Sequence, residues 1–289
     1  MPIQGGDSVS LVRFRALILV PYSSPTFSTY LAAMQTEDSS QLDMLSNAGK
    51  PAIFKNRDTL SLHFDVNTLQ SEMRIDNPDD LVLEYTQAMM GFLLFNPEPK
   101  RIGMIGLGGG SLPKFCYRFL QKTTIEVAEI DPQVIGLRRA FHIPDDDERL
   151  SVRCIDGAEF VREADAWFDV LLVDGFDKSG QPPQLCSQQF YDACHDSLAQ
   201  DGIMVVNLLA AAPDTEIYVE RMRLAFDGET VVIDTLDSLN KIIFACKGKA
   251  LQADDSTLRR RMRQLKLLHP LVVSLAAQNI MINRRLPSQ

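Results

Sequence analysis

Hydrophobic residues follow two different patterns along the chain, and the pattern changes near residue 100. Before that point, TLSLHFD (59–65) alternates apolar and polar positions, which is typical of a half-buried strand, and QSEMRI (70–75) fits its hairpin partner. We therefore expect a small antiparallel β unit at 50–76. The segment NPDDLVLEYTQAMMGFLLF (77–95) then places an Asn or Asp N-cap before apolar residues at helical spacing, which predicts a helix.

From residue 100 onward, short apolar runs alternate with amphipathic segments. Apolar runs of this kind are typical of strands that are buried on both faces. Their alternation with helices predicts an α/β fold, a mostly parallel sheet with helices on both faces. The expected strands are RIGMIGL (101–107), TIEVAEID (124–131), LSVRCID (150–156), FDVLLVDGFD (168–177) and GIMVVNLL (202–209). The expected helices are SLPKFCYRFLQ (111–121), PQVIGLRRAF (132–141), AEFVREA (158–164) and QQFYDACHDSLA (188–199).

The C-terminal part of the chain departs from this alternation. Residues 229–248 have the pattern of two strands joined by a short turn, which predicts an antiparallel addition at the sheet edge, for seven strands in all. Residues 255–284 predict one or two helices, with RRRMRQLK (259–266) as a solvated basic face rather than a nucleic-acid contact. We divide the chain into an N-terminal segment, 1–76, that carries the β unit, and a larger domain, 77–289. Residues 1–50 have no clear pattern.

Composition and charge narrow the class of protein. Hydrophobic residues make up 45% of the 289 and charged residues 23%, as in soluble globular proteins, and the net charge of −9 disfavours non-specific nucleic-acid binding. Five cysteines without a CxxC pair favour a reducing compartment. No apolar run is long enough to span a membrane or to form a signal peptide. We expect a cytoplasmic protein that binds no membrane, and no metal, because the four histidines lack ligand spacing.

A glycine loop lies between the first strand of the larger domain and its helix, in MIGLGGGSLPKF (104–115). The dinucleotide fingerprint G-x-G-x-x-G would need glycine at position 111, which is Ser111, and no Walker A lysine follows. The pattern present is G-x-G-x-G, with Gly106, Gly108 and Gly110. By itself this pattern is weak, because the glycines could serve only a tight turn.

Acidic residues at the ends of the next three strands strengthen the case for a ligand. Glu129, Asp156 and Asp174 end the second, third and fourth strands, and ligands of open parallel sheets lie beyond the carboxyl ends of strands. Each acid alone could equally be a capping or turn residue. Together they suit a nucleoside without phosphate, with one carboxylate for ribose, one for the adenine amino group, and glycines for clearance. S-adenosylmethionine has this form.

With these segments the sequence resembles the spermidine/spermine synthase (polyamine aminopropyltransferase) family, which has a Rossmann-like, class I methyltransferase fold. The resemblance extends from about residue 69 to 248. It rests on EYTQAM, GLGGGSLPK, VAEIDPQVI, DDERLSVRCIDGAEFV, FDVLLVDGFDKSG and FYDACHDSLAQDGIMVVNL, which occur in family order. It implies a transferase that uses decarboxylated S-adenosylmethionine, or S-adenosylmethionine, without a metal. It also implies an amine substrate and a homodimer.

The resemblance assigns a role to each matching position. Glu129 would hold the ribose, and Asp156 with Gly157 would hold the adenine. Asp174 would orient and deprotonate the attacking amine. The remaining assignments are Asp177 for the amine chain, Tyr85 for the pocket wall, and Gly180 and Leu185 for the loop over the nucleoside.

Three departures from the family pattern concern the amine half of the site. The family loop reads G-G-G-D-G, and Gly109 stands in place of its aspartate. The Tyr-His-Glu-Met motif is Tyr-Thr-Gln-Ala at 85–88, and the D-x-x-D-P box ends in Lys178 instead of proline. Because each polyamine ammonium needs carboxylate or carbonyl partners, we expect weak or absent activity with putrescine. We also expect Gly109 to adopt a positive φ angle that aspartate tolerates poorly.

Two other function classes fit the same nucleoside site. An S-adenosylmethionine-dependent methyltransferase would use Glu129 and Asp156 unchanged, with Asp174 acting on another nucleophile. A non-catalytic homologue would bind the nucleoside without transferring a group.

Overall fold

The computed structural model describes residues 50–65, 68–177, 180–235, 239–268 and 272–283. Expectations about residues 1–49 and about Lys178 lie outside these ranges.

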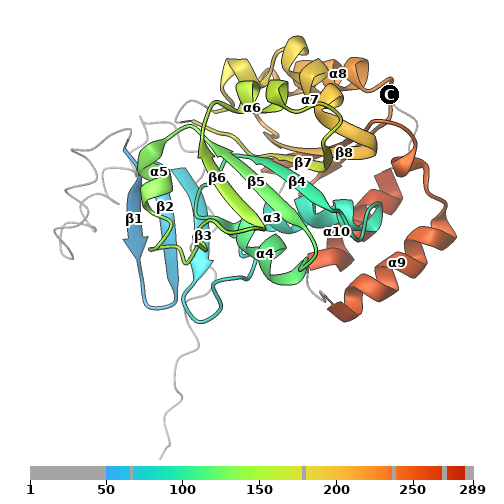
Figure 1. The fold of residues 1–289 in the computed structure, drawn as a ribbon. Helices are drawn as coiled ribbons and strands as arrows, with labels where there is room; N and C mark the ends of the chain where they lie inside the picture. The colour runs from blue at the N-terminus through green and yellow to red at the C-terminus, as the bar shows by residue number, and fades with distance from the viewer. Residues whose placement is uncertain (1–49, 66–67, 178–179, 236–238, 269–271, 284–289) are drawn as a thin grey trace, which may run out of the picture.

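A seven-stranded sheet forms the centre of the larger domain, as the sequence predicts (Figure 1). Its strand order is β6-β5-β4-β7-β8-β10-β9. The pairs among β4 to β8 are parallel, and β10 pairs antiparallel with both β8 and β9. The strands are β4 (Arg101–Ile105), β5 (Thr124–Glu129), β6 (Leu150–Cys154), β7 (Phe168–Val173), β8 (Leu198–Leu209), β9 (Thr230–Asp234) and β10 (Asn240–Cys246).

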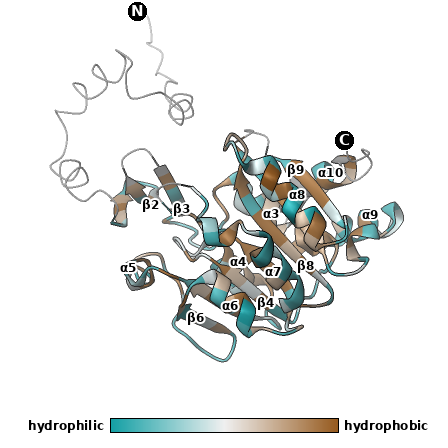
Figure 2. Cartoon of the chain, turned by 90° about the horizontal axis from the view of Figure 1, so that it is seen from above, coloured by the Kyte–Doolittle hydropathy of each residue, from teal (hydrophilic) through white to brown (hydrophobic). Residues whose placement is uncertain are grey.

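Helices cover both faces of this sheet and bury a separate core on each (Figure 1). Alternate residues of β4 divide between the cores, with Met104 in one and Ile105 in the other. One face carries α6 (Gly157–Glu163), α7 (Gln188–Ser197) and α8 (Thr215–Ala225). The other carries α3 (Glu84–Met89), the 3-10 helix η1 (Met90–Leu94), α4 (Ser111–Phe119) and α10 (Val272–Asn283). Figure 2 shows hydrophobic β8 between these layers, with hydrophilic residues on the outside of α7.

Two shorter helical elements lie in the connections between the parallel strands. The helix α5 (Pro132–Gly136) follows β5 and is shorter than the predicted segment 132–141, since it ends at a glycine. The 3-10 helix η2 (Pro183–Leu185) lies in the loop between β7 and α7.

The C-terminal segment forms two helices, α9 (Asp255–Leu268) and α10, after the short 3-10 helix η3 (Ala250–Gln252). Most of the basic run at 259–266 is exposed, as predicted. Arg261 is different, because its guanidinium donates to the carbonyl oxygens of Leu94 (2.9 Å) and Phe95 (2.7 Å) at the end of η1.

The helix α8, between β8 and β9, was not among the elements expected from the sequence.

A separate three-stranded antiparallel sheet precedes the large one. It contains β1 (Ala52–Lys55), β2 (Thr59–Asp65) and β3 (Thr68–Arg74), in the order β1-β2-β3. The antiparallel unit expected at 50–76 is therefore present, with one strand more than the predicted hairpin. The division of the chain into two domains at residue 76 stays a prediction. Strand β3 contacts α4 and so brings its residues to the glycine loop.

The helix expected at 77–95 begins seven residues later, at Glu84. Its N-cap is Leu83, which has no capping side chain, so the predicted Asn or Asp cap is wrong. Asp80 of this segment lies 3.9 Å from the Arg74 guanidinium, which also pairs with Asp76 (2.6 Å), just before the segment.

Candidate active site

The carboxyl ends of neighbouring strands place the predicted acids beside the glycine loop. In the sheet register, Ile105 of β4 pairs with Ala128 of β5 and with Val173 of β7, and Val173 pairs with Val206 of β8. The next residues therefore lie along one edge, and they are Gly106, Glu129, Asp174 and Asn207.

The glycines of the loop serve the packing of the protein itself more than clearance for a ligand. A Cβ at Gly106 would lie 2.3 Å from the carbonyl oxygen of Asp174, and one at Gly110 would lie 2.4 Å from Ile143. At Gly108, with φ of +51°, the nearest atom would be Ser71 Cβ, at 3.8 Å. Of these three predicted positions, Gly108 is the one where a Cβ would make only an ordinary van der Waals contact.

The Glu129 carboxylate holds the loop in place. Its Oε2 accepts a hydrogen bond from the Leu107 N–H (2.9 Å), and its Oε1 accepts one from the Asp131 N–H (2.8 Å). Burial raises the pKa of Glu129, and these N–H groups partly oppose the rise. A carboxylate has about four lone-pair sites, so Glu129 retains acceptor capacity for a hydroxyl group beside its backbone N–H donors.

Asp156 has the capping role that the sequence left open. It is the N-cap of α6, and its Oδ1 accepts from the Ala158 N–H (2.7 Å). Its Oδ2 accepts from Gln184 Nε2 at 3.4 Å. The neighbouring Gly157 packs against Leu185, since a Cβ there would lie 3.2 Å from the leucine side chain and 2.4 Å from Ile105.

Ile130 is a site candidate that sequence reasoning missed. Its side chain is 61% exposed although it follows the buried Glu129 directly. An exposed apolar side chain between two acids at this edge offers a surface for a flat base. Ile130 lies just beyond β5, whose last three residues are all buried, so the strand pattern gave no signal for its exposure.

Asp174 lies between two hydrogen-bond donors from different elements. Asn207 Nδ2 of β8 donates to its Oδ1 (2.9 Å), and the Tyr85 hydroxyl of α3 also donates to the carboxylate. Burial raises the pKa of Asp174 to about 7, against the lowering effect of both donors. The structure thus brings the predicted catalytic acid together with Tyr85, and it adds Asn207, which sequence reasoning did not single out.

Two backbone hydrogen bonds join Asp177 and Gly180 in the loop after β7. The Asp177 N–H donates to the Gly180 carbonyl (2.8 Å), the return bond is 3.2 Å, and Gly180 has a φ of +116°. The side chain of Asp177 is exposed. Gln181 Nε2 donates to the Asn207 carbonyl oxygen (3.0 Å), which ties this loop to the end of β8.

Gly109 is a glycine for a reason other than the expected one. Its φ is not in the positive range, so that expectation is wrong. A Cβ there would instead lie 2.6 Å from Ser71 Oγ of β3 and 2.9 Å from the Phe141 ring. Ser71 is buried, and its hydroxyl lies 3.4 Å from that of Ser111. The Ser71 hydroxyl and the Phe141 ring thus occupy the space into which an acid at 109 would project.

The other departures from the family motif are engaged within the chain. Thr86 Oγ1 donates to the Leu83 carbonyl (2.6 Å), and Gln87 Nε2 donates to the Leu81 carbonyl (2.7 Å). Both side chains therefore stabilise the start of α3.

We expect the variant Gly109→Asp to be less stable than the wild type by about 1–3 kcal/mol, the usual cost of overpacking. Adding Ser71→Gly should recover much of the loss, because it removes the hydroxyl that lies closest. Chemical denaturation measures both effects. Gly136→Asp is the matched control, since no atom lies within 4 Å of a Cβ there. Equal losses at 109 and 136 would contradict the steric explanation.

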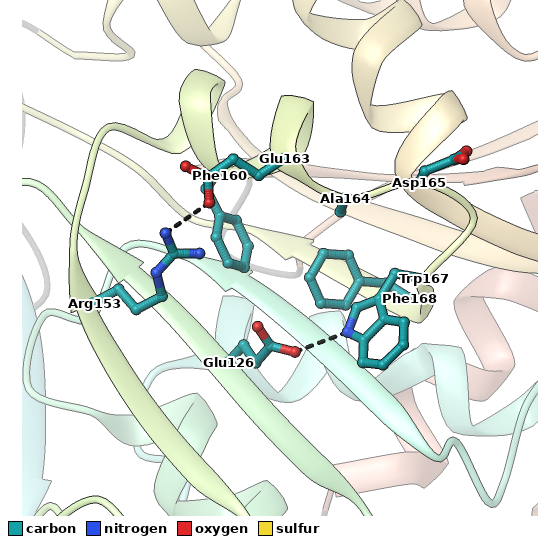
Figure 3. A pocket seen from close by; sticks show the side chains of 8 residues that line it. All are labelled: Glu126, Arg153, Phe160, Glu163, Ala164, Asp165, Trp167 and Phe168. Carbon is teal, nitrogen blue, oxygen red and sulfur yellow. Dashed lines mark hydrogen bonds and ion pairs between the residues drawn. The ribbon is translucent and has the colours of Figure 1, made fainter.

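A separate hollow of about 250 Å³ lies below α6, between β5, β6 and the start of β7 (Figure 3). Four of its side chains form two pairs, with Trp167 Nε1 donating to Glu126 (2.8 Å) and Arg153 bound to Glu163 (2.6 Å). None of the residues that line it is a predicted site residue.

The described residues hold no group of three His, Cys, Asp or Glu side chains arranged to bind a metal ion. In the same part of the chain, no helix is both long and apolar enough to cross a membrane.

The chain is similar in sequence to proteins named as aminopropyltransferases and to one named as a methyltransferase. Residues 83–219 match the spermine/spermidine synthase domain. The polyamine aminopropyltransferase of Chromobacterium violaceum is 34% identical over 207 residues, which are 71% of this chain and 79% of the relative. The eEF1A lysine and N-terminal methyltransferase of Mus musculus is 31% identical over 146 residues, 45% of this chain and 21% of that protein.

A solved structure shares the fold. It is a spermidine synthase in complex with the transition-state analogue AdoDATO, with a TM-score of 0.65 and 21% identity, and the match covers 82% of each chain.

Proposed function

The chain belongs to the spermine/spermidine synthase family, and we propose that this transferase moves an aminopropyl group from decarboxylated S-adenosylmethionine to an amine. The observation that carries the proposal is the position of Asp174. It lies at the carboxyl edge of the sheet beside the glycine loop, with its carboxylate between Tyr85 and Asn207.

In this proposal the donor nucleoside lies along the ends of β4, β5 and β6. Glu129 accepts hydrogen bonds from the ribose, Asp156 and the Gly157 backbone hold the adenine, and Ile130 and Leu185 supply apolar contacts. The acceptor capacity of Glu129 and the absence of a close contact beside Gly108 support this placement.

Asp174 acts as the general base. An alkylammonium of ordinary pKa near 10.4 must lose a proton before its nitrogen can attack. The carboxylate takes that proton, and the amine nitrogen bonds to the donor carbon next to the sulfonium. The carbon–sulfur bond breaks, its electron pair stays on sulfur, and methylthioadenosine leaves. A base with a pKa of about 7 is well matched to this task at neutral pH.

The acceptor differs from an ordinary diamine. Gly109 supplies no carboxylate, Ser71 and Ser111 present hydroxyls in that region, and Lys178 adds a cation to the loop after β7. Since an ammonium group needs charged or carbonyl partners, we propose that putrescine is a poor substrate.

A methyltransferase is the second candidate. The loss of the acid at position 109 favours it, and so does the similarity to a lysine methyltransferase. In that case the donor is S-adenosylmethionine, and Asp174 acts on another nucleophile.

The test is to incubate the purified protein with each donor and a panel of amines and to identify the nucleoside product. We expect methylthioadenosine from decarboxylated S-adenosylmethionine, with a rate on putrescine well below about 1 per second. Putrescine turnover at or above that rate would contradict the acceptor proposal. Formation of S-adenosylhomocysteine with no methylthioadenosine would replace the main proposal with the methyltransferase.

We also propose a cytoplasmic homodimer, as the family resemblance implies. The five cysteines, all free thiols, support a reducing compartment. Light scattering at micromolar concentration tests the dimer, and a monomer there would remove it.

A further inference from the structure

Asn207 is a buried polar residue within the apolar run 203–209 of β8. It is 2% exposed and lies one position beyond Val206, which pairs with Val173 across the β8–β7 ladder. This register brings its Nδ2 within 2.9 Å of Asp174 Oδ1. The contact is therefore built into the sheet, and it does not depend on a surface loop.

Asn240, the first residue of β10, contacts the other end of the same carboxamide. Its Nδ2 donates to Asn207 Oδ1 at 2.9 Å. The backbone of Asn240 is itself fixed, because its N–H donates to Thr235 Oγ1 (3.1 Å) and its carbonyl oxygen accepts from the Thr235 N–H (2.9 Å). A hydrogen-bonded chain thus runs from the end of β9 through Asn240 and Asn207 to Asp174.

The direction of this chain matters because a carboxamide has a donor end and an acceptor end. A donor from Asn240 selects the oxygen of Asn207, and the Asn207 NH₂ group then faces Asp174. If the amide turned over, its oxygen would face the carboxylate and would favour the protonated acid.

We propose that Asn240 is a positioning residue, which fixes the orientation of the Asn207 amide and thereby keeps Asp174 in the form that accepts a proton. The role rests on the proposed function in one respect only, namely that Asp174 is the base. The contacts among Asn240, Asn207 and Asp174 follow from the sheet and do not depend on that function.

The other polar and charged side chains near Asp174 do not replace its hydrogen bond from Asn207. Tyr85 of α3 also donates to the carboxylate, and it is the titratable side chain that shifts the pKa of Asp174. Lys241 follows Asn240 on β10, but its amine pairs with Asp234 (3.3 Å) and Glu216 (3.5 Å). Asp177 is exposed in the loop after β7. Burial, which raises the pKa of Asp174 to about 7, makes the orientation of the neighbouring dipole effective.

Two substitutions at position 240 test the proposal. Asn240→Leu removes the donor at similar size and leaves the Asn207 amide free to turn over. Asn240→Asp offers only acceptors when ionised, so it should draw the Asn207 NH₂ toward itself and turn the amide oxygen toward Asp174. The control Lys241→Gln alters the adjacent residue of β10 and leaves the hydrogen-bonded chain intact.

The first readout is the carboxyl ¹³C NMR signal of Asp174 during a pH titration, assigned by its loss in Asp174→Asn. We expect Asn240→Leu to raise the titration midpoint by about one pH unit, the tenfold change that loss of one charge-assisted hydrogen bond implies. Asn240→Asp should raise it at least as much, and Lys241→Gln should not. An unchanged midpoint in both position-240 variants would overturn the proposal, and this measurement needs no turnover.

The second readout is the pH profile of transfer. With the midpoint raised from about 7 to about 8, Asn240→Leu should be about fivefold slower at pH 7 and nearly normal at pH 9. A purely structural defect would lower the rate equally at both pH values, and would overturn the proposal. If no donor supports transfer in the wild type, the proposed function fails, while the NMR titration still decides the role of Asn240.

Discussion

Replacing Asp174 with asparagine should lower kcat/KM for group transfer by about 10²–10⁴-fold, the usual contribution of a positioned general base. The variant keeps the size of the side chain and its contact with the Tyr85 hydroxyl, but it cannot take a proton from the amine. Steady-state release of the nucleoside product measures the loss. Affinity for methylthioadenosine should change little, because the donor contacts come from other strands.

The wild type provides a companion measurement. Because the pKa of Asp174 is about 7, kcat/KM should fall as the pH drops below 7 and the carboxylate becomes protonated. Asp165→Asn is the control for Asp174→Asn, since it removes an acid from the loop before β7, at the opposite end of that strand. If Asp174→Asn retained a rate within about tenfold of the wild type, Asp174 would not be the base.

Replacing Glu129 with alanine should weaken methylthioadenosine binding by at least about 30-fold, or about 2 kcal/mol, through loss of the ribose hydrogen bonds. The structure adds a second effect, because Glu129 also accepts from the Leu107 and Asp131 N–H groups. Those buried donors would lose their partner, so the free energy of unfolding should fall as well. Calorimetry measures the first effect and chemical denaturation the second.

Glu129→Gln separates the two roles. Its side-chain oxygen can still accept from one N–H group, so stability should recover in part while ribose binding stays weakened. A Glu129→Ala variant that binds methylthioadenosine as tightly as the wild type would show that this acid does not hold the ribose.

The sequence predicted most of the strands because their apolar runs report burial directly. It also placed Glu129 and Asp174 at one edge, since parallel strands share a direction. It mispredicted the start of α3, where Asp80 of the cap signal at 77–80 lies beside Arg74 and the helix begins only after Leu83. Local pattern carries no information about such a partner.

The details of the site depended on contacts between distant segments. The steric reason for Gly109 involves Ser71, which comes from another sheet, 38 positions earlier. The role of Asn240 depends on the antiparallel register that brings β10 against β8. The sequence left two roles open for Asp156, and the structure shows the capping role, while adenine binding stays a prediction.

The burial of Asp174 also makes folding of the chain a proton-uptake reaction. Its pKa is 3.8 as a free side chain and about 7 in the folded protein. Between these values the native state binds more protons than the unfolded state, so this group makes the protein less stable as the pH rises from 4 to 7. The loss is at most about 4 kcal/mol and is complete above pH 7. A cationic acceptor beside the ionised carboxylate would offset that cost, so amine ligands should raise the Tm more at pH 8 than at pH 5.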